Sequence, residues 1–192
     1  MSAIPKTKLT PEEYLEMERK SEERHEYFDG QIFAMSGAKF NHNVIAWNLG
    51  SELKQKLKDK KCVACPSDMR VFIPATGLYT YPDLVVVCGK PQFQDDVFDT
   101  LLNPVLIIEV LSETTEGYDR GKKFLNYRSI ETLQEYVLVS QDEARIEKYV
   151  KRADGLWVLS DAVGLEAEIK FDSIDCLISL KEVYDKVDFS DE

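Results

Sequence analysis

The chain has 192 residues and a formal net charge of −11, with 44% hydrophobic and 31% charged residues. This length suits one domain with one sizeable core, and the composition is that of an ordinary globular protein. The acidic balance argues against a protein that coats nucleic acid non-specifically, because phosphate contacts need Lys and Arg. We predict a single domain over residues 1–192, with disordered ends at about 1–7 and 187–192.

The first residues and the cysteines bear on the cellular compartment. The segment MSAIPKTKLTPEEY lacks the apolar stretch of a secretory signal, and no apolar run approaches the roughly 20 residues of a membrane span. We therefore expect a cytoplasmic protein with no membrane partner. Cys62 and Cys65 form a C-x-x-C pair, but they lie in a segment that reads as a strand rather than at the helix start that activates a thiolate. Cys88 and Cys176 form no second pair for zinc, so we predict buried, reduced thiols, with thiol redox chemistry as a weaker alternative.

Secondary structure is predicted from caps, turns and periodicity, in chain order. Thr10, Pro11 and Glu13 have the spacing of an N-cap, a first helical residue and a capping box. Residues 25–37 alternate around Asp29-Gly30, which predicts a β-hairpin. Apolar residues recur at helical spacing over residues 41–60 and predict an amphipathic helix.

The second half of the chain is rich in predicted strands. Short strands are expected at residues 62–65, 69–73 and 83–88, and the unbroken runs LVVV and VLII are typical of strands covered on both faces. A helix follows at 116–130, then a β-meander over residues 135–161 and a short helix near the end. The predicted fold class is α/β, with a mixed β-sheet core flanked by helices, an N-terminal helix and hairpin, and a C-terminal β-meander.

Two carboxylates stand at the ends of predicted strands. Asp83 follows Pro82 at the start of DLVVVC, and Glu109 ends the run VLIIE. A carboxylate at the end of a buried strand is costly to desolvate, so it needs a partner, a metal or a chemical role. Neighbouring strands would bring both groups to one end of the sheet, where Mg²⁺ can bind one or two carboxylates.

Lysines follow on the next predicted helix. Asp119, Lys123 and Tyr127 share one stripe of that helix, whereas Lys122 lies on another. If Tyr127 is buried, Lys123 turns toward the sheet, where it can stabilise a developing oxyanion, and Lys122 turns toward solvent.

These residues resemble the PD-(D/E)XK nuclease superfamily and, more narrowly, the Uma family of restriction-endonuclease-like bacterial proteins. The matching segments are HEYFDGQIFAMSG, His42, YPDLVVV, and IEVLSETTEGYDRGKKFLNYR followed by EYVLV. The resemblance implies a restriction-endonuclease-like fold and a Mg²⁺-dependent nuclease, with Mn²⁺ as a substitute, whose metal ligands are Asp83 and Glu109. The superfamily pattern has lysine two residues after the acid, where this chain has Leu111, and Lys123 is the matching family position.

Two further residues are candidates for the same site. Glu26 matches a glutamate of the family pattern and is either a further acidic member of the site or an exposed strand residue. His42 is more simply a capping or packing histidine than a base, although histidine often moves protons at neutral pH.

Structural roles compete with these functional ones. Asp83 can cap backbone amides, Glu109 can pair with Arg70 or Arg120, and Lys123 can pair with Asp119. The leading hypothesis is an endonuclease that cuts DNA through a metal-activated water. The alternative is a nuclease-fold protein that binds nucleic acid or a protein without cleavage. A homodimer is expected, because symmetric dimers are the commonest oligomers.

Overall fold

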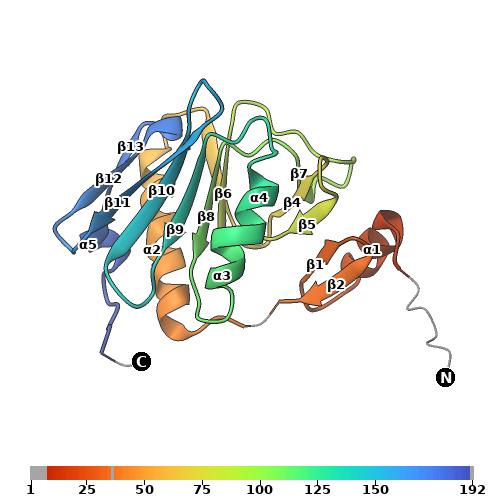
Figure 1. Ribbon diagram of the computed structural model, residues 1–192, viewed down its shortest axis with the longest axis horizontal. Coiled ribbons are helices and arrows are strands. Elements are labelled where there is room, and N and C mark those ends of the chain that lie inside the picture. Colours follow the sequence, from red (N-terminus) through yellow and green to blue (C-terminus); the bar gives the residue numbers. More distant parts are fainter. Residues whose placement is uncertain (1–7, 36, 191–192) are drawn as a thin grey trace.

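The computed structural model describes residues 8–35 and 37–190, which form mixed β-sheets flanked by helices (Figure 1). The elements in chain order are α1 (Pro11–Glu18), β1 (His25–Phe28), β2 (Gln31–Ala34), α2 (Phe40–Lys56), β3 (Cys62–Pro66), β4 (Arg70–Ile73), β5 (Leu78–Thr80), β6 (Leu84–Cys88), β7 (Thr100–Leu101), β8 (Leu106–Val110), α3 (Glu116–Tyr118), the π-helical turn η1 (Asp119–Lys123), α4 (Phe124–Tyr127), β9 (Glu135–Val139), β10 (Arg145–Lys151), β11 (Trp157–Val163), β12 (Glu168–Phe171), the 3-10 turn η2 (Asp172–Ile174), β13 (Cys176–Ser179) and α5 (Leu180–Val183). This arrangement confirms the predicted α/β fold class.

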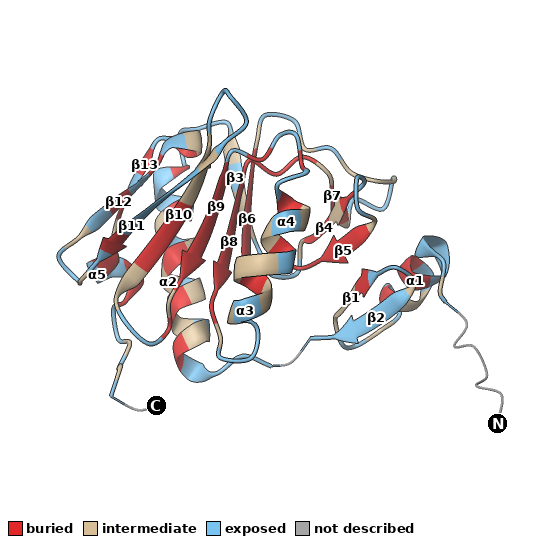
Figure 2. Cartoon of the chain, in the orientation of Figure 1, coloured by how far each residue is buried: buried red, intermediate tan, exposed pale blue. Residues whose placement is uncertain are grey.

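The larger sheet has six strands in the order β11-β10-β9-β8-β6-β3. Strands β8 and β9 run parallel, and the helical segment from α3 to α4 makes the crossover between them. The other neighbouring pairs in this sheet are antiparallel. Strands β6, β8 and β9 are buried along almost their whole length (Figure 2). Their continuous apolar runs are therefore covered on both faces, as the sequence predicted.

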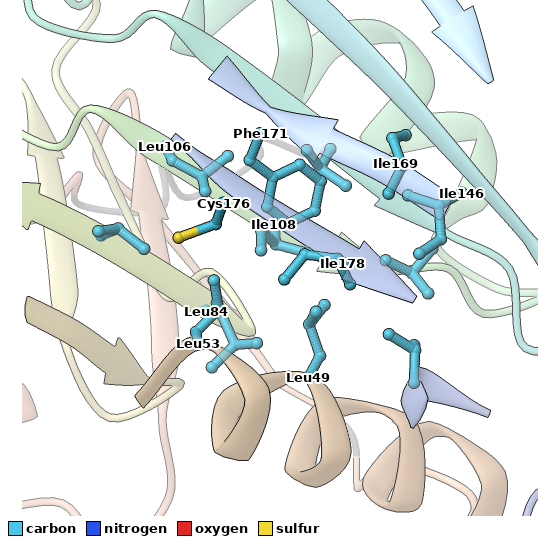
Figure 3. Packing of buried hydrophobic residues seen from close by; sticks show 14 of the residues in the cluster. Leu49, Leu53, Leu84, Leu106, Ile108, Ile146, Ile169, Phe171, Cys176 and Ile178 are labelled. Atoms are coloured by element: carbon cyan, nitrogen blue, oxygen red, sulfur yellow. The ribbon is translucent and has the colours of Figure 1, made fainter. Parts of the chain in front are cut away.

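Helix α2 covers one face of the larger sheet. Its core side is formed by the buried residues Ile45, Leu49 and Leu53. In Figure 3, Leu53 points toward Leu84 of β6 and Leu49 toward Ile178 of β13. Burying one leucine side chain contributes roughly 1.5–3 kcal/mol to the stability of the fold. This apolar layer therefore holds α2, and with it the residues on the opposite face of the helix, in a fixed position against the sheet.

The opposite face of the larger sheet packs against the segment from α3 to α4 and against residues of the smaller sheet. Val85 and Val87 of β6, Ile107 of β8 and Tyr127 of α4 are buried together there. Alternate residues of one strand thus enter two separate cores, because successive side chains point to opposite faces of a sheet.

The smaller sheet has the order β2-β1-β5-β4-β7, and α1 packs against it. The predicted capping box is present at the start of α1: Glu13 N donates to Thr10 Oγ1, and Thr10 N donates to the Glu13 carboxylate. The predicted hairpin joins β1 to β2 through Asp29 and Gly30, which both have positive φ, as a type I′ turn requires.

Four strands were missing from the sequence prediction. Strands β5 and β7 have three and two residues, too few for an alternation to be recognised. Strands β12 and β13 pair with each other, and their alternation of buried and exposed residues was a usable signal that went unrecognised.

A disulfide joins Cys62 of β3 to Cys88 of β6, so the prediction of reduced thiols was wrong for these two residues. The strands are antiparallel and place Cys62 directly opposite Cys88. Cys65 lies closer in sequence, but residues three apart on a strand point to opposite faces. Cys65 and Cys176 keep free thiols, and burial raises the pKa of Cys65.

The chain ends are predicted to be disordered, and residues 187–190 of the predicted C-terminal end lie within the described part of the chain. Val187 and Phe189 pack against the main core, and the backbone carbonyl of Asp188 accepts a hydrogen bond of 2.8 Å from Asn41 Nδ2. These apolar residues within an acidic tail explain why the tail docks. Residues 1–7 and 191–192 lie outside the described residues.

None of the helices in residues 8–35 and 37–190 has the length and the apolar composition of a membrane-spanning segment.

Candidate active site

Asp83 and Glu109 lie side by side because β6 and β8 are antiparallel neighbours. Asp83 directly precedes β6, and Leu84 pairs with Ile108, so the start of β6 lies beside the end of β8. The Asp83 amide faces Glu109 Oε2 at 3.4 Å, and Asp83 Oδ2 accepts a 2.8 Å hydrogen bond from the amide of Val110. Asp83 therefore does cap a backbone amide, as its structural interpretation held, and it also stands next to Glu109.

Lys123 reaches the same point from the crossover between β8 and β9. Its side chain is buried, with Nζ 2.9 Å from Glu109 Oε1, 3.4 Å from Glu26 Oε1 and 3.5 Å from Asp119 Oδ1. Lys122, by contrast, is exposed. The predicted helical stripe thus separates the two lysines as expected.

The turn that carries Lys123 is π-helical, from Asp119 to Lys123. π-Helical turns are rare in proteins, and those that do occur are often found at functional sites. Here the turn keeps Asp119, Lys123 and Tyr127 buried on the face that looks toward Glu109. Tyr127 donates a 2.8 Å hydrogen bond from its hydroxyl to Glu109 Oε1. Asp119 and Tyr127 were noted only as stripe neighbours of Lys123, and that shared stripe was the signal for their place in the site.

Glu26 comes from the smaller sheet. It lies on β1, its side chain is mostly buried, and the hydroxyl of Thr80 on β5 donates to its Oε1. The interpretation of Glu26 as an exposed strand residue was therefore wrong, since the contact between the two sheets encloses it. Both sheets and the crossover helix supply side chains to this cluster.

The cluster holds more negative groups than Lys123 alone can balance. The pKa of Glu109 is raised to about 8: burial raises it most, the Lys123 ammonium lowers it, and the carboxylates of Asp119 and Asp83 raise it. Burial also raises the pKa of Asp119. Burial alone would lower the pKa of Lys123, but Glu109, Glu26 and Asp119 raise it well above the usual value. Lys123 is therefore held as a cation, whereas burial favours the protonated form of Glu109.

His42, near the start of α2, faces Asp83, with Nε2 3.3 Å from Asp83 Oδ2. Burial by itself lowers the pKa of His42, but the Asp83 carboxylate outweighs burial and raises it. Gln141, which follows β9, is buried at the same cleft. Its two amide atoms and His42 Nδ1 have no hydrogen-bond partner within the described part of the chain. No sequence pattern had singled out Gln141.

The competing ion pairs are made elsewhere. Arg70 lies 3.0 Å from Asp99, and Arg120 contacts Glu116 and Glu147, so neither arginine is the partner of Glu109. The pair between Lys123 and Asp119 does form, but it is one of three contacts of the same ammonium.

A cleft of about 780 Å³ opens over these side chains. Asp83, Glu109 and Lys123 form part of its wall, together with the loop after β8, the N-terminal half of α2 and strand β2. Glu109 Oε1 takes the short contacts from Lys123 and Tyr127, which leaves Oε2 with the long contact from Asp83. Among the described residues, no group of three or more His, Cys, Asp and Glu side chains is arranged to hold a metal. Mg²⁺ needs only one or two carboxylates, and oxygen donors on Asp83 and Glu109 fit it.

Comparison with known proteins identifies the family of this chain. A family model, Uma2, described as "Putative restriction endonuclease", matches residues 11–175. The chain belongs to the Uma2 family. Two relatives of this Uma2 protein come from Synechocystis sp. (strain ATCC 27184 / PCC 6803 / Kazusa). The uncharacterized protein sll1609 is 40% identical over 172 residues, covering 89% of this chain and 97% of the relative. The uncharacterized protein slr1290 is 43% identical over 157 residues, covering 82% of each.

A solved structure shares the fold of this Uma2 protein. The crystal structure of a putative nuclease belonging to DUF820 from Anabaena variabilis ATCC 29413 superposes with a TM-score of 0.76. The match covers 92% of this chain and 98% of that one at 19% sequence identity. The similarity establishes a nuclease-like fold, which is the fold that the resemblance of the sequence implied.

Proposed function

We propose that this Uma2 protein is a Mg²⁺-dependent endonuclease that hydrolyses DNA phosphodiester bonds, with Mn²⁺ able to replace Mg²⁺. The observation that carries the proposal is the meeting of Asp83, Glu109 and Lys123 at one end of a sheet, in the wall of a single cleft. Membership of a family whose description is "Putative restriction endonuclease" supports it.

In this proposal Asp83 and Glu109 hold the metal ion. Their oxygen atoms are hard ligands. Burial, and after it the carboxylates of Asp119 and Asp83, raises the pKa of Glu109, and a bound cation would stabilise its ionised form. A divalent ion bound there supplies neutralisation of phosphate charge and activation of water. Lys123 contributes a second positive charge, because its raised pKa keeps the side chain protonated. Its ammonium has a fixed position in the site, because Glu26, Asp119 and Glu109 surround it.

The remaining groups position these residues. Tyr127 holds Glu109 through Oε1, and Val110 and His42 hold Asp83 through Oδ2. Leu111, at the position where the superfamily pattern has lysine, is buried in the core instead. Lys123 instead brings an ammonium group to Glu109 from the η1 turn. The site therefore still has a positive charge beside Glu109, although the lysine that carries it stands at another position in the sequence.

The test is titration calorimetry of Mg²⁺ and Mn²⁺ together with plasmid cleavage, on wild type, Asp83→Ala and Glu109→Ala. We expect metal-dependent cutting by the wild type and loss of metal binding and cutting in both variants. Glu113→Ala is the matched control, because Glu113 is an exposed carboxylate in the wall of the same cleft. Equal metal affinity in wild type and the Asp83 variant would count against the proposal.

A second candidate is a nuclease-fold protein that binds nucleic acid or a protein without cutting. The three carboxylates around Lys123 favour it, because they neutralise the lysine that contacts Glu109. Metal binding without cleavage under all metals tested would select this candidate.

We also propose a homodimer that acts in the cytoplasm, where DNA and Mg²⁺ are available. Strand β11 is an edge of the larger sheet and exposes Val158, Leu159 and Val163, which suits pairing with a second copy. Light scattering on wild type and Leu159→Lys tests it: a wild-type dimer that the substitution converts to monomer supports this interface, and an unchanged mass rejects it.

A further inference from the structure

Aromatic side chains flank the cleft above the candidate catalytic residues. Phe33 of β2 and Trp47 of α2 both line it, and they are 50% and 79% exposed. Exposed apolar side chains that gather at a cleft are typical of a binding surface, because their contact with water is unfavourable until a ligand covers them.

Strand register explains the position of Phe33. Phe33 is the direct partner of Glu26 in the β1-β2 pairing, and cross-strand partners project from the same face of a sheet. The aromatic ring therefore stands beside the carboxylate that contacts Lys123. The amide of Met35 continues the ladder by donating to the carbonyl of Arg24, and Met35 extends the apolar wall of the cleft along the same side.

Helix periodicity explains the position of Trp47. The core side of α2 carries Ile45 and Leu49, whereas Asn43 and Trp47, four residues apart, both line the cleft. His42, on the same part of the helix, contacts Asp83. The indole is thus fixed to a helix that the core holds in place, and it belongs to the same wall as a residue that touches the candidate metal ligand.

The charge of the cleft favours binding of a single strand of nucleic acid over binding of a duplex. Among the described lining residues, five are carboxylic acids and two are lysines: Glu26, Asp83, Glu109, Glu113, Asp119, Lys39 and Lys123. Duplex DNA carries one negative charge per roughly 1.7 Å of axis and needs many cations to bind, whereas a single strand carries half that density. Base–aromatic stacking needs an unpaired base, and it contributes to binding without adding a cation.

We propose that the cleft binds an unpaired stretch of nucleic acid, with bases stacked on Phe33 and Trp47 and the backbone directed to Asp83, Glu109 and Lys123. This inference rests on the proposed nuclease function and names its substrate class. A cleft of about 780 Å³ is of the size that takes a small ligand, and it suits a few unpaired nucleotides from a single strand, an overhang or a flipped base.

The experiment is fluorescence anisotropy with labelled oligothymidylate, with Ca²⁺ in place of Mg²⁺. Three competitors are compared: the matching blunt duplex, a duplex with an unpaired tail, and an abasic strand of equal charge. We expect the single strand and the tailed duplex to bind, and the blunt duplex and the abasic strand to bind far more weakly. Phe33→Ala and Trp47→Ala should each weaken binding of the single strand roughly 5- to 150-fold. Phe98→Ala, an exposed phenylalanine outside the cleft, is the matched control and should leave binding unchanged.

Hydrolysis of bis(p-nitrophenyl) phosphate separates this inference from the proposed function, because the small diester need not reach the aromatic side chains. Hydrolysis of the diester by the wild type, with strand binding lost in Phe33→Ala and Trp47→Ala, supports the inference. Equal binding of blunt duplex and single strand, or of abasic and normal strands, would overturn it even if the diester is cut. Base-dependent binding without diester hydrolysis would leave the inference standing and reject the proposed function. A dimer that dissociates in both variants, with strand binding unchanged, would show instead that a second copy covers these rings.

Discussion

Replacing Lys123 by methionine tests the electrostatic core of the site. The Lys123 side chain is 8% exposed, and its ammonium lies within 3.5 Å of Glu109, Glu26 and Asp119. Methionine keeps a similar volume, so the change isolates the charge. Removing one partner of a buried ion pair typically costs about 3–5 kcal/mol, because the remaining charges lose their compensation. For a chain of this size that loss lowers the melting temperature by about 6–20 °C.

The cost should depend on pH in a defined direction. The pKa of Glu109 is raised to about 8, from a usual value of 4.5, so its protonated form is favoured in the folded state. A carboxyl group of this kind favours folding at low pH and loses that contribution as pH rises from 4.5 through about 8. Without Lys123 the pKa of Glu109 rises further, and the loss continues to higher pH. The variant should therefore be destabilised more at pH 9 than at pH 6.

Urea unfolding followed by circular dichroism, at both pH values, measures this difference. Lys122→Met is the matched control, since Lys122 is exposed on the neighbouring position of the same turn. Its effect should stay within about 0.5 kcal/mol. A loss below about 1 kcal/mol for Lys123→Met at both pH values, or a larger loss at pH 6, would refute the reasoning.

Three other predictions concern the metal, the disulfide and acid stability. Mg²⁺ at a hundredfold excess over its Kd should stabilise the wild type by about 2.7 kcal/mol, and Asp83→Asn should abolish the effect in a calorimetric scan; stabilisation retained in the variant would place the ion elsewhere. Breaking the link between Cys62 and Cys88, 26 residues apart, by a Cys62→Ala substitution should cost about 3.5 kcal/mol by loop entropy, measured by urea unfolding; no change on adding reductant to the wild type would contradict it. The pKa of Asp99 is lowered, with burial opposing the shift and hydrogen bonds from Arg19 and Thr100 and the charge of Arg70 driving it, so this group stabilises the fold above its unfolded pKa and loses that effect as pH falls through the lowered value. Asp99→Asn should therefore be destabilising at pH 7 and much less so at strongly acidic pH; a constant difference in unfolding free energy would refute this.

The candidate site was largely readable from local patterns because each of its main residues sits next to a strong local signal. Asp83 and Glu109 bracket the two most apolar strands, and Lys123 shares a helical stripe with a tyrosine. Those signals predict that a residue lies at the end of a strand or on the buried face of a helix. They do not predict how close two such residues come in the folded protein, and Glu26 is an example. Its burial depends on the second sheet closing over the first, so its sequence neighbours alone left it open between a site residue and a surface one.

Sequence by itself determined the α/β class, the capping box at Thr10, the hairpin turn at Asp29 and Gly30, and the side of the helix to which Lys123 belongs. These follow from interactions between residues a few positions apart. The tertiary structure decided that Cys62 meets Cys88, that Phe33 and Trp47 flank one cleft, and that Gln141 is buried beside it. Such pairings join residues that are distant in sequence, and strand register and helix packing set them through the whole core, so no local pattern carries them.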